Sequence, residues 1–267
     1  MRHYLLAIPY LGIVVRSCFQ RWRIARADIH ARRVRFFSPS LPDPDQVFWI
    51  DPAKIVRHTD FSRSVQNLSP EDRVFDTLRD KGKVYSGDWD LSTFKFSDLS
   101  VYKAIEDRIQ SNRNWSETEF YRSLSQNLSE DTPWRIRSLA DLDKRCDYID
   151  ALIENIRTEG FRQAHEVLLA EEPRSLKHHP KYGNFVTVNI GRTGEFLFQD
   201  GRHRLAIAQV LRVPKIPVKV LVRHSEWVAI RTKVKKAQSP RNMTEHRSRE
   251  TLGDESHPDL RDILTKS

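Results

Sequence analysis

The feature that most constrains the fold is a succession of strand and turn signals in the second half of the chain. Phe185–Ile190 alternates and is rich in β-forming residues, Gly191–Gly194 has the composition of a hairpin turn, and Glu195–Phe198 is predicted to be the returning strand. Apolar residues then follow at helical spacing over Arg202–Leu211, and Ile216–Val222 is predicted to form another strand. This succession predicts an α+β fold. It is compatible with a small crossover unit whose ligand end is the strand-to-helix turn.

That turn, Asp200-Gly201-Arg202-His203-Arg204, is the strongest candidate for a functional site. A helix N-terminus is the positive end of the helix dipole, so each cation in its first turn costs about 0.3–1 kcal/mol. The free backbone N–H groups at a helix start bind anions, and the cations therefore make physical sense if a phosphate sits there. The alternative is that the arginines point into solvent and pair with nearby carboxylates. The Asp-Gly pair favours the phosphate site, because glycine permits a sharp turn that a ligand can approach.

The same residues resemble the nucleotide-binding box of the ParB/sulfiredoxin superfamily, a Gly-x-x-Arg turn that holds the phosphates of CTP, ATP or ADP. Gly201, His203 and Arg204 match the Gly-Cys-His-Arg turn of sulfiredoxins. Arg202 stands where their reactive cysteine would be, which excludes sulfinic-acid reduction. ParB proteins have Gly-Glu-Arg-Arg, of which Gly201 and Arg204 match. The closest form is the Asp-Gly-x-His-Arg turn of the free serine kinase branch.

The resemblance covers residues 184–224, and Val47–Ile55 resembles the opening strand of the ParB-type domain. It implies a ParB/sulfiredoxin-like domain over residues 45–225, with a small mixed sheet and helices, and a nucleotide such as ATP, ADP or CTP as the ligand. The implied nucleotide-binding residues are Asp200, Gly201, Arg202, His203 and Arg204, and His203 is also a candidate catalytic residue. The sequence lacks the Asn-Pro-Arg segment of ParB proteins, so we do not expect their CTP-clamp function.

A second candidate site lies upstream, where Val84–Asp90 is predicted to be a short strand that runs into a turn. Residues two apart on an extended strand face the same side, so Asp88 and Asp90 could converge on one point. Two carboxylates there could hold Mg²⁺ against a nucleotide phosphate, or one could act as a base toward a hydroxyl group. Together with the basic turn they would supply the two halves of a phosphoryl-transfer site. The alternative is an Asp-rich turn with Trp89 buried in the core.

The segment over residues 97–175 is predicted to be a helical insertion in this domain. Ser116–Glu119 has the pattern of a helix start, and a longer helix is predicted to begin after Ser138 and to end at Gly160. Six apolar residues lie on one face of that longer helix, which predicts a core face: Leu139, Leu142, Cys146, Ile149, Ile153 and Ile156. Residues 235–267 are polar and mixed in charge, and we expect them to form a disordered tail.

The excess positive charge is concentrated at the N-terminus. Residues 1–35 contain eight arginines against one acid, Asp28, in a chain whose net charge is +9. The apolar stretch Tyr4–Val15 is too short to span a bilayer. Residues 1–35 are predicted to include a basic amphipathic helix, which could lie on an anionic membrane surface or dock on the domain. The two cysteines form no motif, so we expect a cytoplasmic protein, peripheral on the membrane if the helix binds lipid.

Two functions remain open at this stage. The first is a nucleotide-dependent phosphotransferase or NTP hydrolase that acts on an unidentified small hydroxyl compound, with Asp88 or Asp90 as Mg²⁺ ligand or base. The alternative is a non-catalytic ParB-like DNA-associated module or nuclease, in which the basic turn contacts nucleic-acid phosphate. Outside residues 1–35 the chain is nearly neutral, and no helix-turn-helix pair with a basic second helix is recognisable. Both observations favour the first function.

Overall fold

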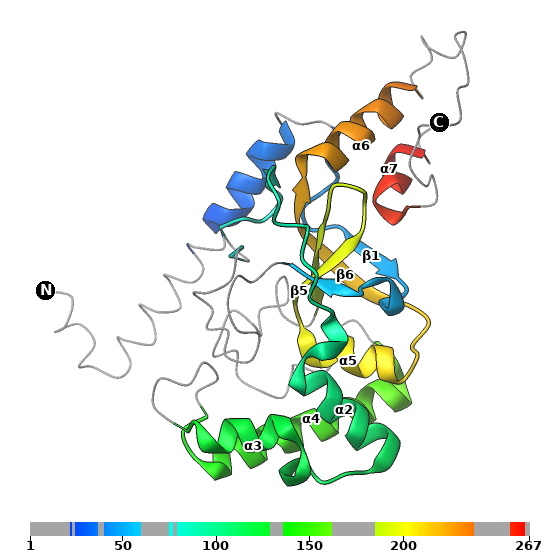
Figure 1. Ribbon diagram of the computed structural model, residues 1–267. Coiled ribbons are helices and arrows are strands. Elements are labelled where there is room, and N and C mark those ends of the chain that lie inside the picture. Colours follow the sequence, from blue (N-terminus) through cyan, green and yellow to red (C-terminus); the bar gives the residue numbers. More distant parts are fainter. Residues whose placement is uncertain are drawn as a thin grey trace, which may run out of the picture.

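A computed structural model describes residues 22, 25–36, 40–59, 75–76, 79–128, 136–161, 185–237 and 257–264. Its centre is a mixed sheet whose strand order is β1-β6-β4-β5-β2, with β3 also paired to β6 (Figure 1). The strands are β1 (Val47–Ile50), β2 (Arg57–His58), β3 (Val84–Tyr85), β4 (Val186–Ile190), β5 (Phe196–Asp200) and β6 (Ile216–His224). The predicted α+β class is confirmed.

The hairpin predicted from the sequence is present, but the strand–helix–strand unit differs from the crossover that we expected. Strands β4 and β5 are antiparallel, whereas β4 and β6 are parallel. Helix α5 (Arg202–Val210) therefore connects two antiparallel strands that are separated by β4. The crossover prediction is wrong because a crossover joins parallel strands. Here β5 and β6 are antiparallel, so β5 ends and β6 begins at the same end of the strands.

The helices predicted between residues 97 and 161 pack against α5. Helix α2 (Ser100–Ser111) and helix α4 (Leu139–Glu159) both contact α5, and α3 (Glu119–Gln126) contacts α2 and α4. Figure 1 shows these four helices gathered on one side of the sheet. Helix α4 begins and ends as predicted, because the Ser138 hydroxyl accepts from the Asp141 N–H and Gly160 takes a positive φ of 69°. Residues 162–175 lie outside the described part of the chain.

The main core lies between the sheet and these helices. It contains five of the six residues predicted for the inner face of α4, whereas Leu139 is 52% exposed at the start of the helix. Alternate residues of β4 (Val186, Val188 and Ile190) and α5 residues 205–208 complete its centre. Burial of apolar surface is the main stabilising contribution, at roughly 25 cal/mol per Å².

The other face of the sheet has a buried polar cluster. The Asn189 amide donates to Thr59 Oγ1 and to Gln199 Oε1, both at 2.7 Å. The Gln199 amide in turn donates to the carbonyl oxygen of Phe75 at 3.1 Å. Since buried polar groups are costly when unpaired, these bonds fix the register of β4 and β5 and tie both strands to the segments next to them.

The C-terminal segment corrects a prediction from the sequence. Residues 235–237 end helix α6 (Ser225–Ala237), and residues 257–264 form a turn of 3-10 helix (Pro258–Leu260) and the short helix α7 (Arg261–Leu264). The Asp259 side chain is fully buried and pairs with Arg223 on β6 at 2.6 Å and with Arg231 on α6 at 3.3 Å. A disordered tail is therefore the wrong description of residues 235–237 and 257–264. The predicted tail between and beyond them lies outside the described residues.

Residues 25–36 form a helix that contacts the domain (Figure 1). Ala27 and Ala31 are buried, and Asp28 pairs with Lys81 at 2.8 Å. In the part of the chain that the structure describes, no helix has the length and apolar character needed to cross a bilayer.

Candidate functional site

The turn from β5 into α5 has the geometry that its sequence predicts. Gly201 has a φ of +92°, and a Cβ atom there would lie 3.0 Å from the carbonyl oxygen of Phe185. Both the backbone conformation and the space therefore require glycine. The Asp200 carboxylate accepts from the Gly201 N–H at 2.9 Å. The N-cap residue Gly201 has no side chain with which to cap α5, and the N–H groups in the first turn of a helix favour an anion.

Helix α4 adds a fourth basic residue to this turn. Arg145 Nη2 lies 3.3 Å from Nδ1 of His203, and the Arg145 guanidinium lies over the ring of Tyr148 at 5.2 Å. Arg145, His203 and Arg204 are all half-buried. The sequence analysis did not find Arg145, which is 58 residues away from His203. Its position beside the apolar face of α4 was the only local signal.

The surroundings of Arg145 and Arg204 disfavour the charged forms of their own side chains. Burial lowers the pKa of Arg204, although Tyr148 and Asp200 offset part of that effect. Burial also lowers the pKa of Arg145, and the charge of Arg204 lowers it further. Desolvation and a like charge both penalise the protonated form, and the helix dipole acts in the same direction. An anion between these groups would relieve all three penalties.

Asp88 and Asp90 converge on one point, as predicted, but that point is the guanidinium of Arg192. Each carboxylate accepts from Arg192 Nη2 at 2.8 Å, and Asp90 also accepts from the backbone N–H and Nε of Arg192. Burial would raise the pKa of Asp90, whose side chain is 0% exposed, but its hydrogen bonds to Arg192 hold that pKa below the ordinary value. Trp89 packs edge-on against Phe75 at 5.1 Å. The alternative of an Asp-rich turn therefore fits this segment, although Trp89 is half-buried against a small apolar cluster and lies outside the main core.

Because a cation already sits between them, Asp88 and Asp90 do not fit the role of Mg²⁺ ligands. No group of three or more His, Cys, Asp or Glu side chains in the described ranges could hold a metal ion. The second difficulty is position. Arg192 lies in the turn before β5 and Gly201 lies directly after it, so a strand of five residues, about 17 Å long, separates the two. The single phosphoryl-transfer site expected from these two halves is therefore wrong.

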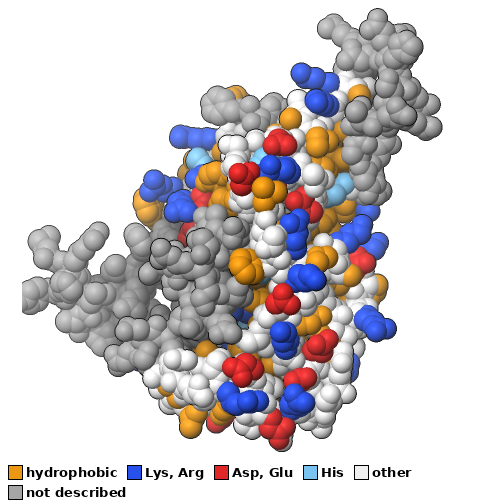
Figure 2. Space-filling view, viewed as in Figure 1, with side chains coloured by type: hydrophobic (Ala, Val, Ile, Leu, Met, Phe, Trp, Pro, Cys, Tyr) orange, Lys and Arg blue, Asp and Glu red, His pale blue; other side chains and the backbone are white. Residues whose placement is uncertain are grey.

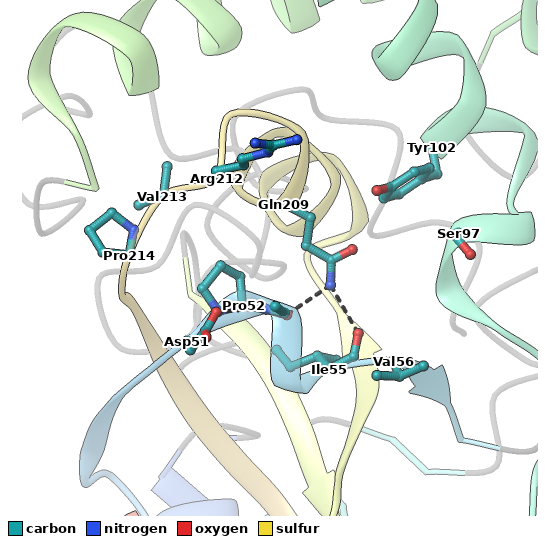
Figure 3. Close-up of a pocket in the computed structure, with 11 residues that line it drawn as sticks. Asp51, Pro52, Ile55, Val56, Ser97, Tyr102, Gln209, Arg212, Val213 and Pro214 are labelled. Atoms are coloured by element: carbon teal, nitrogen blue, oxygen red, sulfur yellow. Dashed lines mark hydrogen bonds between the residues drawn. The ribbon is translucent and has the colours of Figure 1, made fainter.

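A pocket of about 460 Å³ lies at the opposite end of α5 (Figure 3). Tyr102, Gln209 and Arg212 are among the residues that line it. The Gln209 amide is engaged with the chain itself, because it donates to the carbonyl oxygens of Pro52 at 2.8 Å and Ile55 at 2.9 Å. The nine residues of α5 extend over about 13 Å. This distance is several times the separation of reacting atoms, about 3–3.5 Å, so the pocket and the basic turn do not form one reaction centre.

The whole chain, which includes this site, was compared with known proteins. Neither the models of known protein families, nor the curated proteins, nor the solved structures gave a match. The geometry of the turn at Gly201 is therefore the basis for a functional proposal.

Proposed function

We propose that this protein binds the phosphate groups of a nucleotide at the turn formed by Gly201 and the first residues of α5. The observation that carries the proposal is the convergence of Arg145 from α4 with His203 and Arg204 at a helix N-terminus. A phosphate at this position would accept charge-assisted hydrogen bonds from cations that two helices bring together in a half-buried position. ATP, ADP and CTP are the ligands implied by the resemblance of the turn.

The reaction that we propose is phosphoryl transfer to a small hydroxyl compound, or hydrolysis of the nucleotide. Positioned cations stabilise the charge on a phosphoryl group during transfer, and the basic turn would serve this purpose. Asp200 supplies a carboxylate directly before the turn. Asp88 and Asp90 have no role in this proposal, because Arg192 pairs with both.

The test measures nucleotide binding by calorimetry for the wild type, Arg145→Ala and Arg204→Ala. A hydrogen bond to a charged group contributes about 1.5–3 kcal/mol, so each variant is expected to weaken binding by about 10- to 150-fold. The unfolding temperature of each variant without nucleotide is measured as well, so that a loss of binding can be distinguished from a loss of folding. ATP, ADP, CTP and GTP are each tested with and without Mg²⁺.

A matched control is Arg157→Ala, which removes another arginine from α4. Arg157 pairs with Glu154 on the exposed surface of the same helix, so this variant should bind nucleotide as the wild type does. The proposal fails if no nucleotide binds, or if Arg145→Ala and Arg157→Ala affect binding equally. Binding of DNA that falls steeply with added salt, in the absence of nucleotide binding, would instead support the DNA-associated module.

A further inference from the structure

In the described part of the N-terminal helix, residues 25–36 together with Trp22, the buried side chains are small ones, and Val34 beside them is half-buried. Ala27 is 7% exposed and Ala31 is 2% exposed. Ala31 also lies next to the turn at Gly82, where an added Cβ would come within 3.5 Å of it. The ion pair between Asp28 and Lys81 joins the same face of the helix to the domain. This inward face is therefore narrow and carries the only acidic residue of the segment.

The three largest apolar side chains among the described residues of this helix lie on the opposite face. Trp22, Ile29 and Phe36 are 54%, 56% and 78% exposed. They are spaced seven residues apart, and residues at this spacing lie within about 20° of one direction around a helix. We call these three residues the apolar stripe. A helix that docks on a domain normally turns its largest apolar residues inward, whereas these three face outward.

Arginines lie along both sides of the apolar stripe. At about 100° per residue, Arg26 and Arg33 fall on one side of it and Arg32 falls on the other. All three are exposed, and the guanidinium of Arg26 lies 5.4 Å from the centre of the Trp22 ring. In the space-filling view, basic and apolar side chains lie next to one another over this corner of the molecule (Figure 2).

We infer that the apolar stripe and its flanking arginines bind the surface of an anionic membrane. An interfacial helix inserts large apolar residues between lipid headgroups while its arginines contact the phosphates around them. The charge of the whole segment fits this partner, with eight arginines against one acid in residues 1–35. A second copy of the chain fits less well, because its arginines would meet the same arginines across the stripe.

The experiment measures co-sedimentation of the full chain with two kinds of vesicle, pure phosphatidylcholine and equimolar phosphatidylcholine and phosphatidylglycerol. The wild type is expected to sediment with the anionic vesicles and to stay in the supernatant when the vesicles are neutral. Combined substitution of Trp22→Ser, Ile29→Ser and Phe36→Ser should reduce the partition coefficient about tenfold or more, since each substitution removes apolar area that the membrane would bury. Arg26→Glu with Arg33→Glu should reduce binding similarly, and added salt should weaken the binding of the wild type.

The control variant carries Phe94→Ser and Leu139→Ser, two exposed apolar positions away from the N-terminal helix. It should bind anionic vesicles like the wild type, and circular dichroism should show that all variants are folded. The proposal is overturned if the wild type binds neither vesicle, or if the control variant loses as much binding as the stripe variant. A dimer that depends on the stripe, with no binding to anionic vesicles, would also overturn it.

Discussion

Replacement of Asp259 by alanine should destabilise the protein far more than its place near the end of the chain suggests. The Asp259 carboxylate accepts three hydrogen bonds from Arg223, one from Nη2 at 2.6 Å and two from Nε at 3.1 and 3.2 Å, and one from the indole N–H of Trp227 at 2.9 Å. The side chains of Arg223 and Arg231 are 3% and 0% exposed. Removal of the carboxylate leaves both guanidinium groups buried without this partner, whereas Arg231 keeps its contacts with Asp262 and the Ser40 carbonyl oxygen.

Removal of one partner from a buried ion pair costs about 3–5 kcal/mol. A typical domain is stable by only about 5–15 kcal/mol, so Asp259→Ala should lose a large part of the free energy of unfolding. The assay is urea denaturation at neutral pH, in which the midpoint should fall while the slope stays close to that of the wild type. Asp259→Asn keeps an acceptor for Trp227 but removes the charge, and we expect its stability to lie between that of the wild type and that of Asp259→Ala.

The matched control is Asp262→Ala in the same segment. Asp262 contacts Arg231 at 3.0 Å but is 27% exposed, so its loss should cost at most about 1 kcal/mol. A loss below about 1 kcal/mol for Asp259→Ala, or equal losses for the two variants, would refute the argument that residues 257–264 complete the core.

Three further predictions concern the turns and the pH. Gly201→Ala should cost about 1–3 kcal/mol, because a positive φ and a nearby carbonyl oxygen oppose a side chain; in thermal denaturation it should exceed Gly160→Ala, where a Cβ would meet nothing within 4 Å. Arg192→Ala should cost about 1–3 kcal/mol in urea denaturation, because it leaves the Asp90 carboxylate buried without its main donor, and it should leave nucleotide binding unchanged. The folded state lowers the pKa of Asp90 and Asp259, so their stabilising effect should be complete above about pH 4 and be lost as the pH falls through the lower folded values. Unfolding temperatures measured from pH 7 to pH 3 that do not fall would contradict this.

The sequence predicted the elements whose signals are local. The hairpin with its strands β4 and β5 follows from β-forming residues on either side of a glycine turn, and α4 lies between the caps Ser138 and Gly160 that the sequence indicates. The glycine turn at Gly201 was predicted for the same reason. Caps, turns and apolar spacing depend on residues only a few positions apart, and the energies that favour them are present before the chain has a tertiary structure.

Only the tertiary structure decided which charges meet. Arg192 pairs with Asp88 and Asp90, which are 104 and 102 residues away in the sequence. Arg145 contacts His203 at a separation of 58 residues, and Asp259 pairs with Arg223 at a separation of 36 residues. Each of these contacts depends on the strand order and on the helices that cover the sheet. A charged side chain carries no local preference for a particular distant partner, since its pairing depends on which segments burial of apolar surface brings together.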